Sequence, residues 1–180
     1  MKDLEDISLV AQAAGGRSRK AFDKLVRKYQ SPLRLFFLSQ TMGDKQLSDD
    51  LAQDTFIKAY LNLDKFRGES SFSTWLYRIG YNVYCDYVRH NRLTDDIDSV
   101  NLRPTLVASQ STGLTLDMQN ALLVLNDKER ICITMQLVEG LATEHIAEIT
   151  GMSSGTVRSC LSRGKQKLAN YLRQNGYERK

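Results

Sequence analysis

Residues 141–168, LATEHIAEITGMSSGTVRSCLSRGKQKL, carry the clearest structural signal in the chain. Apolar residues recur with helical spacing on both sides of a tight turn, Thr150-Gly151-Met152. Ala147 is small enough to let two helices approach closely, Gly151 can adopt the positive φ that ends a helix, and Val157 faces the same core. This spacing is typical of a helix-turn-helix. We therefore predict that motif here, with Thr143 capping its first helix.

The second helix of this motif, expected over residues 153–174, has the composition of a DNA-contacting element. Residues 156–180 contain seven lysines and arginines against one acid, Glu178, which gives a local charge of +6. In a helix-turn-helix, the start of the second helix enters the major groove while flanking cations hold phosphates. The alternative is an exposed charged helix without a ligand. The candidate contacts are Ser153, Ser154, Thr156, Arg158, Ser159, Arg163 and Lys167.

Apolar residues keep a helical period along most of the remaining chain, which contains only 2 prolines. Ser48 is the expected cap of the third helix, and Pro32 is expected to kink or divide the second. We therefore expect an all-α fold of two small helical domains. The spacing predicts helices over residues 6–14, 18–40, 48–63, 73–91, 117–125, 127–139, 143–150 and 153–174.

The helical period is lost between Arg92 and Leu116, where polar and acidic residues surround Pro104. Structureless stretches of this length are uncommon inside compact domains, so we interpret the segment as a flexible linker rather than a surface loop. The predicted organisation is a first domain over 1–92, a linker over 93–115 and a second domain over 116–180.

Composition excludes several classes of protein. No apolar run approaches the roughly 18 residues of a membrane span, and the acidic N-terminus lacks the features of a signal peptide, so we expect a cytoplasmic protein. Cys85, Cys132 and Cys160 are too scattered for a disulfide framework or a zinc site. The two histidines, His90 and His145, have no partner at ligand spacing. We expect no metal and no cofactor.

Six aromatic residues fall within residues 72–87, on a predicted helix. Tyr77, Tyr81 and Tyr84 share one face, while Arg78 and Asn82 lie on a more polar face. Such aromatics are usually core residues, yet aromatics beside arginine and asparagine can also stack on unpaired bases. Periodicity does not decide between these two interpretations.

The helix expected over 48–63 has an acidic face that includes Asp49, Asp50, Gln53 and Asp54. A metal site would require converging ligands from elsewhere, and the sequence offers no second cluster of carboxylates or histidines. The face is either solvated or a docking surface for a basic protein partner.

Three segments, in this order, resemble the extracytoplasmic-function (ECF, group 4) sigma factors of the sigma-70 family. DDLAQDTFIKAY at 49–60 looks like the polymerase-binding helix of their region 2. FRG at 66–68 with FSTWLYRIGYN at 72–82 looks like their −10 loop and recognition helix. LNDKER at 125–130 with GTVRS at 155–159 looks like region 4, and the resemblance covers nearly the whole chain.

The resemblance implies a transcription initiation factor that binds core RNA polymerase, recognises −10 and −35 promoter elements and promotes DNA melting. Asp50, Gln53 and Asp54 would dock on the β′ clamp helices of the core enzyme. Region 4 would place the candidate contacts around Arg158 in the −35 major groove. An anti-sigma factor, membrane-associated in this family, is a further implied partner, and no small-molecule substrate is implied. The residues implied for the −10 element are Arg67, Gly68, Ser70 and Ser71 in a loop that captures a flipped base, with Arg78 and Asn82.

The chain departs from the family pattern at two places in or beside the recognition helix. Cys160 stands where relatives commonly have arginine, and Ser153-Ser154 replaces an acidic or proline-containing turn. These departures put the −35 sequence preference in doubt, but not DNA binding.

Two other classes of function compete with this one. A stand-alone repressor or activator would use the helix-turn-helix but would leave the acidic and aromatic helices unexplained. A helical enzyme would require a nucleophile–base pair, a phosphate loop or a metal set, none of which the sequence contains.

Overall fold

The computed structural model describes residues 2–16, 18–95 and 120–177, and within these ranges it contains helices and no strand. The all-α expectation is therefore confirmed for the described part of the chain. Within the described ranges, no helix combines the length and the apolar composition of a membrane span. The helices are α1 (Lys2–Gly16), α2 (Arg19–Gln40), α3 (Lys45–Leu61), the short 3-10 helix η1 (Leu63–Lys65), α4 (Phe72–Asp95), α6 (Asp127–Glu139), α7 (Thr143–Thr150) and α8 (Ser154–Gln174).

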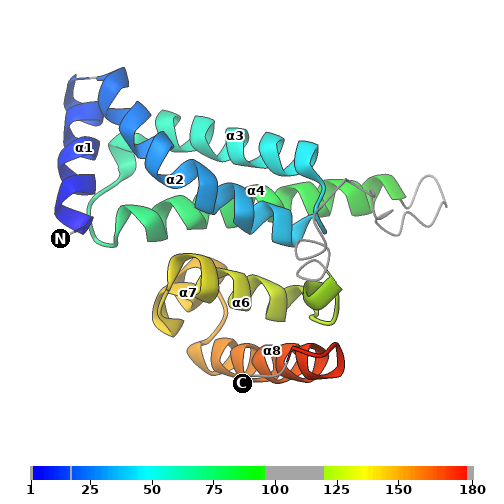
Figure 1. Cartoon of the computed structure of the whole chain (residues 1–180). Helices are drawn as coiled ribbons and strands as arrows, with labels where there is room; N and C mark the ends of the chain where they lie inside the picture. The colour runs from blue at the N-terminus through cyan, green and yellow to red at the C-terminus, as the bar shows by residue number, and fades with distance from the viewer. Residues whose placement is uncertain (1, 17, 96–119, 178–180) are drawn as a thin grey trace. The chain divides into compact units, whose positions relative to one another are not determined.

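The chain divides into two compact units. The first comprises Met1–Phe37 and Asp49–Asn101, and the second comprises Leu38–Ser48 and Leu102–Lys180. Figure 1 shows α1 to α4 in blue to green and α6 to α8 in yellow to red. The expected linker falls mostly on residues 96–115, which lie outside the described part of the chain, and α4 continues to Asp95 rather than ending at residue 91.

The core of the first unit is formed by apolar faces of α1, α2, α3 and α4. Leu25, Leu33, Phe36 and Phe37 on α2 are fully buried, as their helical spacing predicts. α4 packs tightly at Gly80, where an added Cβ would lie 3.3 Å from Leu33 and 3.5 Å from Thr55 of α3. This burial also explains why α2 is not divided at Pro32: packing outweighs the lost backbone hydrogen bond.

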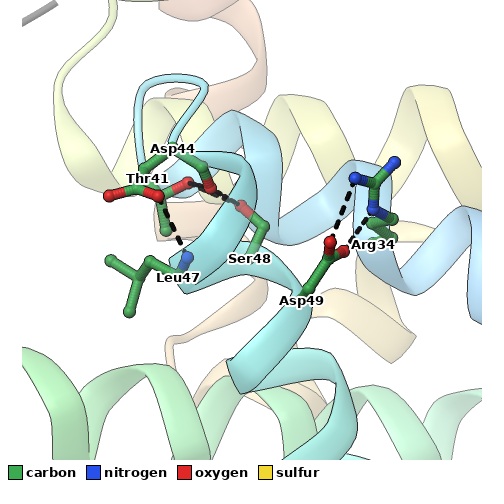
Figure 2. A network of polar contacts seen from close by, with 6 residues as sticks. All are labelled: Arg34, Thr41, Asp44, Leu47, Ser48 and Asp49. Carbon is green, nitrogen blue, oxygen red and sulfur yellow. Dashed lines mark hydrogen bonds and ion pairs between the residues drawn. The ribbon is translucent and has the colours of Figure 1, made fainter. Parts of the chain in front are cut away.

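α3 begins three residues earlier than predicted, because its cap is Asp44 and not Ser48 (Figure 2). The Asp44 carboxylate accepts a hydrogen bond from the backbone N–H of Leu47 at 3.0 Å. Ser48 is buried inside the first turn, where its hydroxyl donates to the Asp44 carbonyl and lies 2.8 Å from the hydroxyl of Thr41. Both residue types favour caps, and here the earlier one is used.

The second unit packs α6, α7 and α8 around a small core. Asn126 and Glu129 form a reciprocal capping box at the start of α6. α7 has the predicted bounds, but its cap is Ala142: Thr143 is the first helical residue, and no side chain caps the helix. Gly151 ends α7 with a φ of 70°, as predicted. The fully buried side chains include Ile133, Met135, Ile146 and Val157.

Candidate nucleic-acid and polymerase interfaces

The three residues expected to dock on the polymerase lie together on an exposed face of α3. Asp50, Gln53 and Asp54 are spaced at i, i+3 and i+4, so their side chains share one side of the helix. The opposite side is buried through Thr55 and Ala59, which have no exposed surface. The face thus presents carboxylates and an amide to the surroundings, a composition that suits a basic protein surface.

Asp49 is also exposed but is paired within the unit. Its carboxylate lies against the guanidinium of Arg34 on α2, with one nitrogen–oxygen distance of 3.2 Å (Figure 2). This bidentate pair joins α2 to α3 at the edge of the acidic face. Asp49 therefore serves the packing of the two helices, whereas Asp50 and Asp54 lie further around the surface.

Beside this face, α2 and α3 border an apolar groove of about 500 Å³, which sequence reasoning missed. Gln53 lines the groove as well as belonging to the docking set. Ile57, Tyr60 and Leu61 keep 49%, 39% and 69% of their surface exposed. One sequence feature could have indicated this groove: Tyr60 and Leu61 are apolar but lie at the end of a helix whose other apolar residues already form its buried face.

The loop before α4 contains four residues expected to contact the −10 element. Arg67 and Gly68 are exposed, and Gly68 has a φ of 71°, which favours glycine. Ser70 is half-buried. Ser71 has a structural role, because its hydroxyl accepts from the backbone N–H of Thr74 at 3.1 Å and so caps α4.

The aromatic residues around α4 are mainly packing residues. Tyr77 is fully buried, and its ring meets that of Phe36 edge-on at 5.6 Å. Phe66, Phe72 and Trp75 form a cluster with centroid distances between 5.5 and 5.9 Å. The cluster anchors the loop 67–71 at both ends.

Arg78 and Asn82 are exposed on α4, one turn apart. Because i and i+4 side chains share a face, these two polar residues form a pair on the outer side of a helix whose inner side is core. Arginine and asparagine provide donors in planar groups that can read base edges.

The helix-turn-helix places the first turn of α8 on the surface. Ser153 caps α8 by accepting from the backbone N–H of Thr156 at 3.2 Å, so α8 begins at Ser154 and not Ser153. Thr156, Arg158 and Ser159 are exposed, whereas Ser154 is half-buried. The guanidinium of Arg158 lies 3.6 Å from the carboxylate of Glu144 on α7, and both side chains are about two-thirds exposed.

Arg163 and Lys167 lie on a different side of α8, beside α6. The Lys167 ammonium donates to the carboxylate of Glu129 at 2.7 Å, and Arg163 lies 3.9 Å from the same carboxylate. The seven residues predicted for the −35 element therefore fall into two groups, five near the start of α8 and two facing Glu129. Sequence reasoning missed this carboxylate, which is separated from Lys167 by 38 positions.

Cys160 is buried in the core of the second unit and does not share the exposed face of Arg158 and Ser159. Its neighbour is Cys132 on α6; burial, reinforced by the contact with Cys160, raises the pKa of Cys132 to about 12. Both cysteines are free thiols. The departure from the family pattern at position 160 therefore acts on packing.

Among the described residues, no group of three or more histidines, cysteines, aspartates or glutamates could hold a metal ion.

Family comparisons match both units. Sigma-70 region 2 matches residues 25–94, and Sigma-70 region 4 matches residues 115–168. The ECF RNA polymerase sigma-E factor of Haemophilus influenzae is 30% identical over an alignment of 189 positions, gaps included, which covers 95% of this chain and 97% of that protein. The sigma-E factor of Escherichia coli is 34% identical over 94% of this chain and 95% of its own length.

The chain belongs to the ECF group of the sigma-70 family. This sigma factor directs RNA polymerase to promoters for transcription initiation, and the resemblance seen in the sequence is confirmed. Two solved structures share its fold. CnrH in complex with the cytosolic domain of CnrY is 26% identical, with a TM-score of 0.72 and coverage of 96% of this chain and 99% of that one. The sigma factor RpoE in complex with the anti-sigma factor NepR, from Bartonella quintana, is 29% identical, with a TM-score of 0.74 over 86% and 98% of the two chains.

Proposed function

We propose that this sigma factor grips promoter DNA at two points, with the −35 element held by α8 and the −10 element by the loop 67–71 and α4. The observation that carries the proposal is the helix-turn-helix: Gly151 ends α7, Val157 is fully buried, and the first turn of α8 is exposed. That arrangement leaves Thr156, Arg158 and Ser159 accessible to a major groove.

At the −10 element, the proposed contacts are the exposed Arg67 and Gly68, with Ser70 beside them and Arg78 and Asn82 on α4. Capturing an unstacked base in this loop would offset the cost of opening the duplex, a few kcal/mol per base. DNA melting then follows from binding free energy. Ser71 contributes by holding the start of α4, through its hydrogen bond to Thr74.

Core RNA polymerase is proposed to dock its β′ clamp helices on Asp50, Gln53 and Asp54. Their shared exposed face supports this role, as does the pairing of Asp49 with Arg34, which fixes α3 against α2. In domain terms, we propose that residues 1–92 bind the core enzyme and the −10 element, and that 116–180 bind the −35 element. The proposed linker between them, predicted at 93–115, begins only after α4 ends at Asp95.

The protein is proposed to be non-catalytic, without a cofactor or small-molecule substrate, and to act in the cytoplasm where RNA polymerase transcribes. We also propose that a membrane-associated anti-sigma factor regulates it. The structures of RpoE with the anti-sigma factor NepR and of CnrH with the cytosolic domain of CnrY support this partner class.

Run-off transcription with purified core RNA polymerase tests the proposal. The DNA comes from promoters mapped by sequencing the 5′ ends of transcripts that rise when the protein is overproduced. We expect initiation only when core enzyme and this chain are both present, with loss of initiation when either element is scrambled. Binding to promoter DNA without core-dependent initiation would instead identify a stand-alone regulator and contradict the proposal.

A further inference from the structure

A buried carboxylate lies where α6 meets α8. The Glu129 side chain is only 2% exposed. Its Oε2 accepts from the Lys167 ammonium at 2.7 Å and from the backbone N–H of Asn126 at 3.1 Å, while Oε1 lies 3.9 Å from Nε of Arg163. Two cations of α8 therefore face one charge inside the unit.

The contact between the helices fixes this arrangement. Gly164 is buried, and an added Cβ there would lie 2.8 Å from Cγ1 of Ile133 and 3.6 Å from Cβ of Glu129. The backbone of α8 thus packs against Ile133 and lies beside the Cβ of Glu129. Residues 163 and 167 flank this point, so the carboxylate reaches both cations while it remains shielded from water.

We propose that Glu129 is an internal counter-ion that withholds Lys167 from DNA phosphates and thereby limits the cationic contact of α8. The inference rests on the proposed −35 role of α8 and revises one member of that set. If Lys167 moved to a phosphate, the buried carboxylate would lose its close cation and keep only the Asn126 N–H and Arg163 at 3.9 Å. A buried charge without a close counter-charge is strongly unfavourable. A lysine that contacts a phosphate gains free energy mainly because it displaces the counterions condensed on the DNA. A lysine that a carboxylate already neutralises displaces few of these counterions.

Arg163 is held less closely by Glu129 than Lys167 is. Its side chain is 63% exposed against 44% for Lys167, and its distance to the carboxylate is longer. Because Lys167 is the close cation of Glu129, Arg163 can turn to a phosphate without leaving the carboxylate unpaired. Glu129 is therefore a positioning residue that separates the two cations by role.

The test uses Glu129→Gln and Lys167→Met in the full chain, reconstituted with core RNA polymerase. Glutamine at position 129 can still accept from the Asn126 N–H and so retains the capping box. Glu148→Gln, at an exposed acid on α7, is the control for the loss of one negative charge. Affinity for a mapped promoter duplex is measured from 50 to 200 mM salt, with circular dichroism as the check of folding.

We expect Glu129→Gln to steepen the slope of log K against log salt by about 0.9, because one more cation reaches a phosphate. That change equals about a 3.5-fold larger loss of affinity across the four-fold range of salt. Lys167→Met and Glu148→Gln should leave the slope unchanged, and the double variant Glu129→Gln/Lys167→Met should return to the wild-type slope.

Three outcomes would overturn the inference: a flatter slope in Lys167→Met, no steepening in folded Glu129→Gln, or equal steepening in Glu148→Gln. Lys167→Met decides the matter alone if Glu129→Gln does not fold. A duplex with a scrambled −35 element separates the two proposals. If wild-type affinity ignores scrambling, the −35 role of α8 fails along with this inference, whereas a retained −35 preference without the predicted slopes overturns this inference only.

Discussion

The phenol of Tyr29 donates a hydrogen bond to the buried carboxylate of Asp6 and so joins α2 to α1. The other carboxylate oxygen pairs with Lys28. Asp6→Ala leaves the buried hydroxyl without this acceptor, and we expect it to destabilise the docking of α1 by about 1–3 kcal/mol. Hydrogen exchange should show faster exchange of α1 amides, while Asp23→Ala, at an exposed site on α2, should leave them unchanged. Equal protection in both variants would contradict this role.

Gly164 and Gly155 lie on the same helix but differ in the space around them. A Cβ at Gly164 would lie 2.8 Å from Ile133, whereas one at Gly155 would meet only Ser153 at 3.9 Å. We expect Gly164→Ala to destabilise the second unit by about 1–3 kcal/mol through overpacking. Gly155→Ala should stabilise α8 by about 0.5–1 kcal/mol. Thermal unfolding followed by circular dichroism measures both, and equal effects would contradict the predicted difference in packing.

Reversing charge on the exposed face of α3 should weaken docking on the core enzyme. We expect the double variant Asp50→Lys/Asp54→Lys to compete poorly with the wild-type chain for core RNA polymerase, because two attractive charges become repulsive. Asp23→Lys, on α2, is the control: it reverses one exposed charge away from this face and should leave competition for core RNA polymerase unchanged. Undiminished competition by the double variant would remove these two residues from the proposed interface.

Arg158 is free to exchange its partner when DNA binds, because its pair with Glu144 is long and exposed. If its guanidinium reads a base, Arg158→Ala should cost about 1–3 kcal/mol and relax the preference at one −35 position. Binding assays on duplexes with single −35 substitutions measure both effects. A uniform loss on every duplex would identify a phosphate contact instead.

The stability of the second unit should depend on the ionisation of Glu129. Burial alone would raise the pKa of this carboxyl, but hydrogen bonds from Lys167 and the Asn126 backbone, with the charges of Lys167 and Arg163, hold it below the ordinary 4.5. A carboxyl with a lowered pKa in the folded state stabilises that state above its unfolded pKa, and this contribution is lost as pH falls through the folded value. Wild type should therefore lose its stability advantage over Glu129→Gln below about pH 4.5 in thermal unfolding. A difference that does not change with pH would contradict this.

Local patterns predicted much of the fold. The bounds of α6 and α7 and the left-handed Gly151 follow from periodicity and from a glycine whose conformational freedom ends a helix. Capping residues are harder to predict from the sequence, because several residues that can cap a helix stand close together. Asp44 and Ser48 can both accept from a first turn, and which of them does so depends on whether Ser48 is buried.

The candidate sites were predictable as surfaces but not as individual partners. The shared face of Asp50, Gln53 and Asp54 follows from helical spacing alone. The pairing of Lys167 with Glu129 does not follow from helical spacing, because it depends on how α8 crosses α6. From the sequence, both residues would be expected to face solvent. The burial of Cys160 does not follow from helical spacing either, because it depends on contact with Cys132 in another helix.

The aromatic cluster beside the loop 67–71 has an optical consequence. Trp75 is the single tryptophan of the chain. Its ring centroid lies 5.5 Å from that of Phe66, the residue immediately before the loop 67–71. Indole emission depends on the rings and polar groups around it, so it responds to the position of that loop. The protein therefore carries an intrinsic fluorescent reporter at the edge of its proposed −10 contact, which can follow that contact in real time without a label.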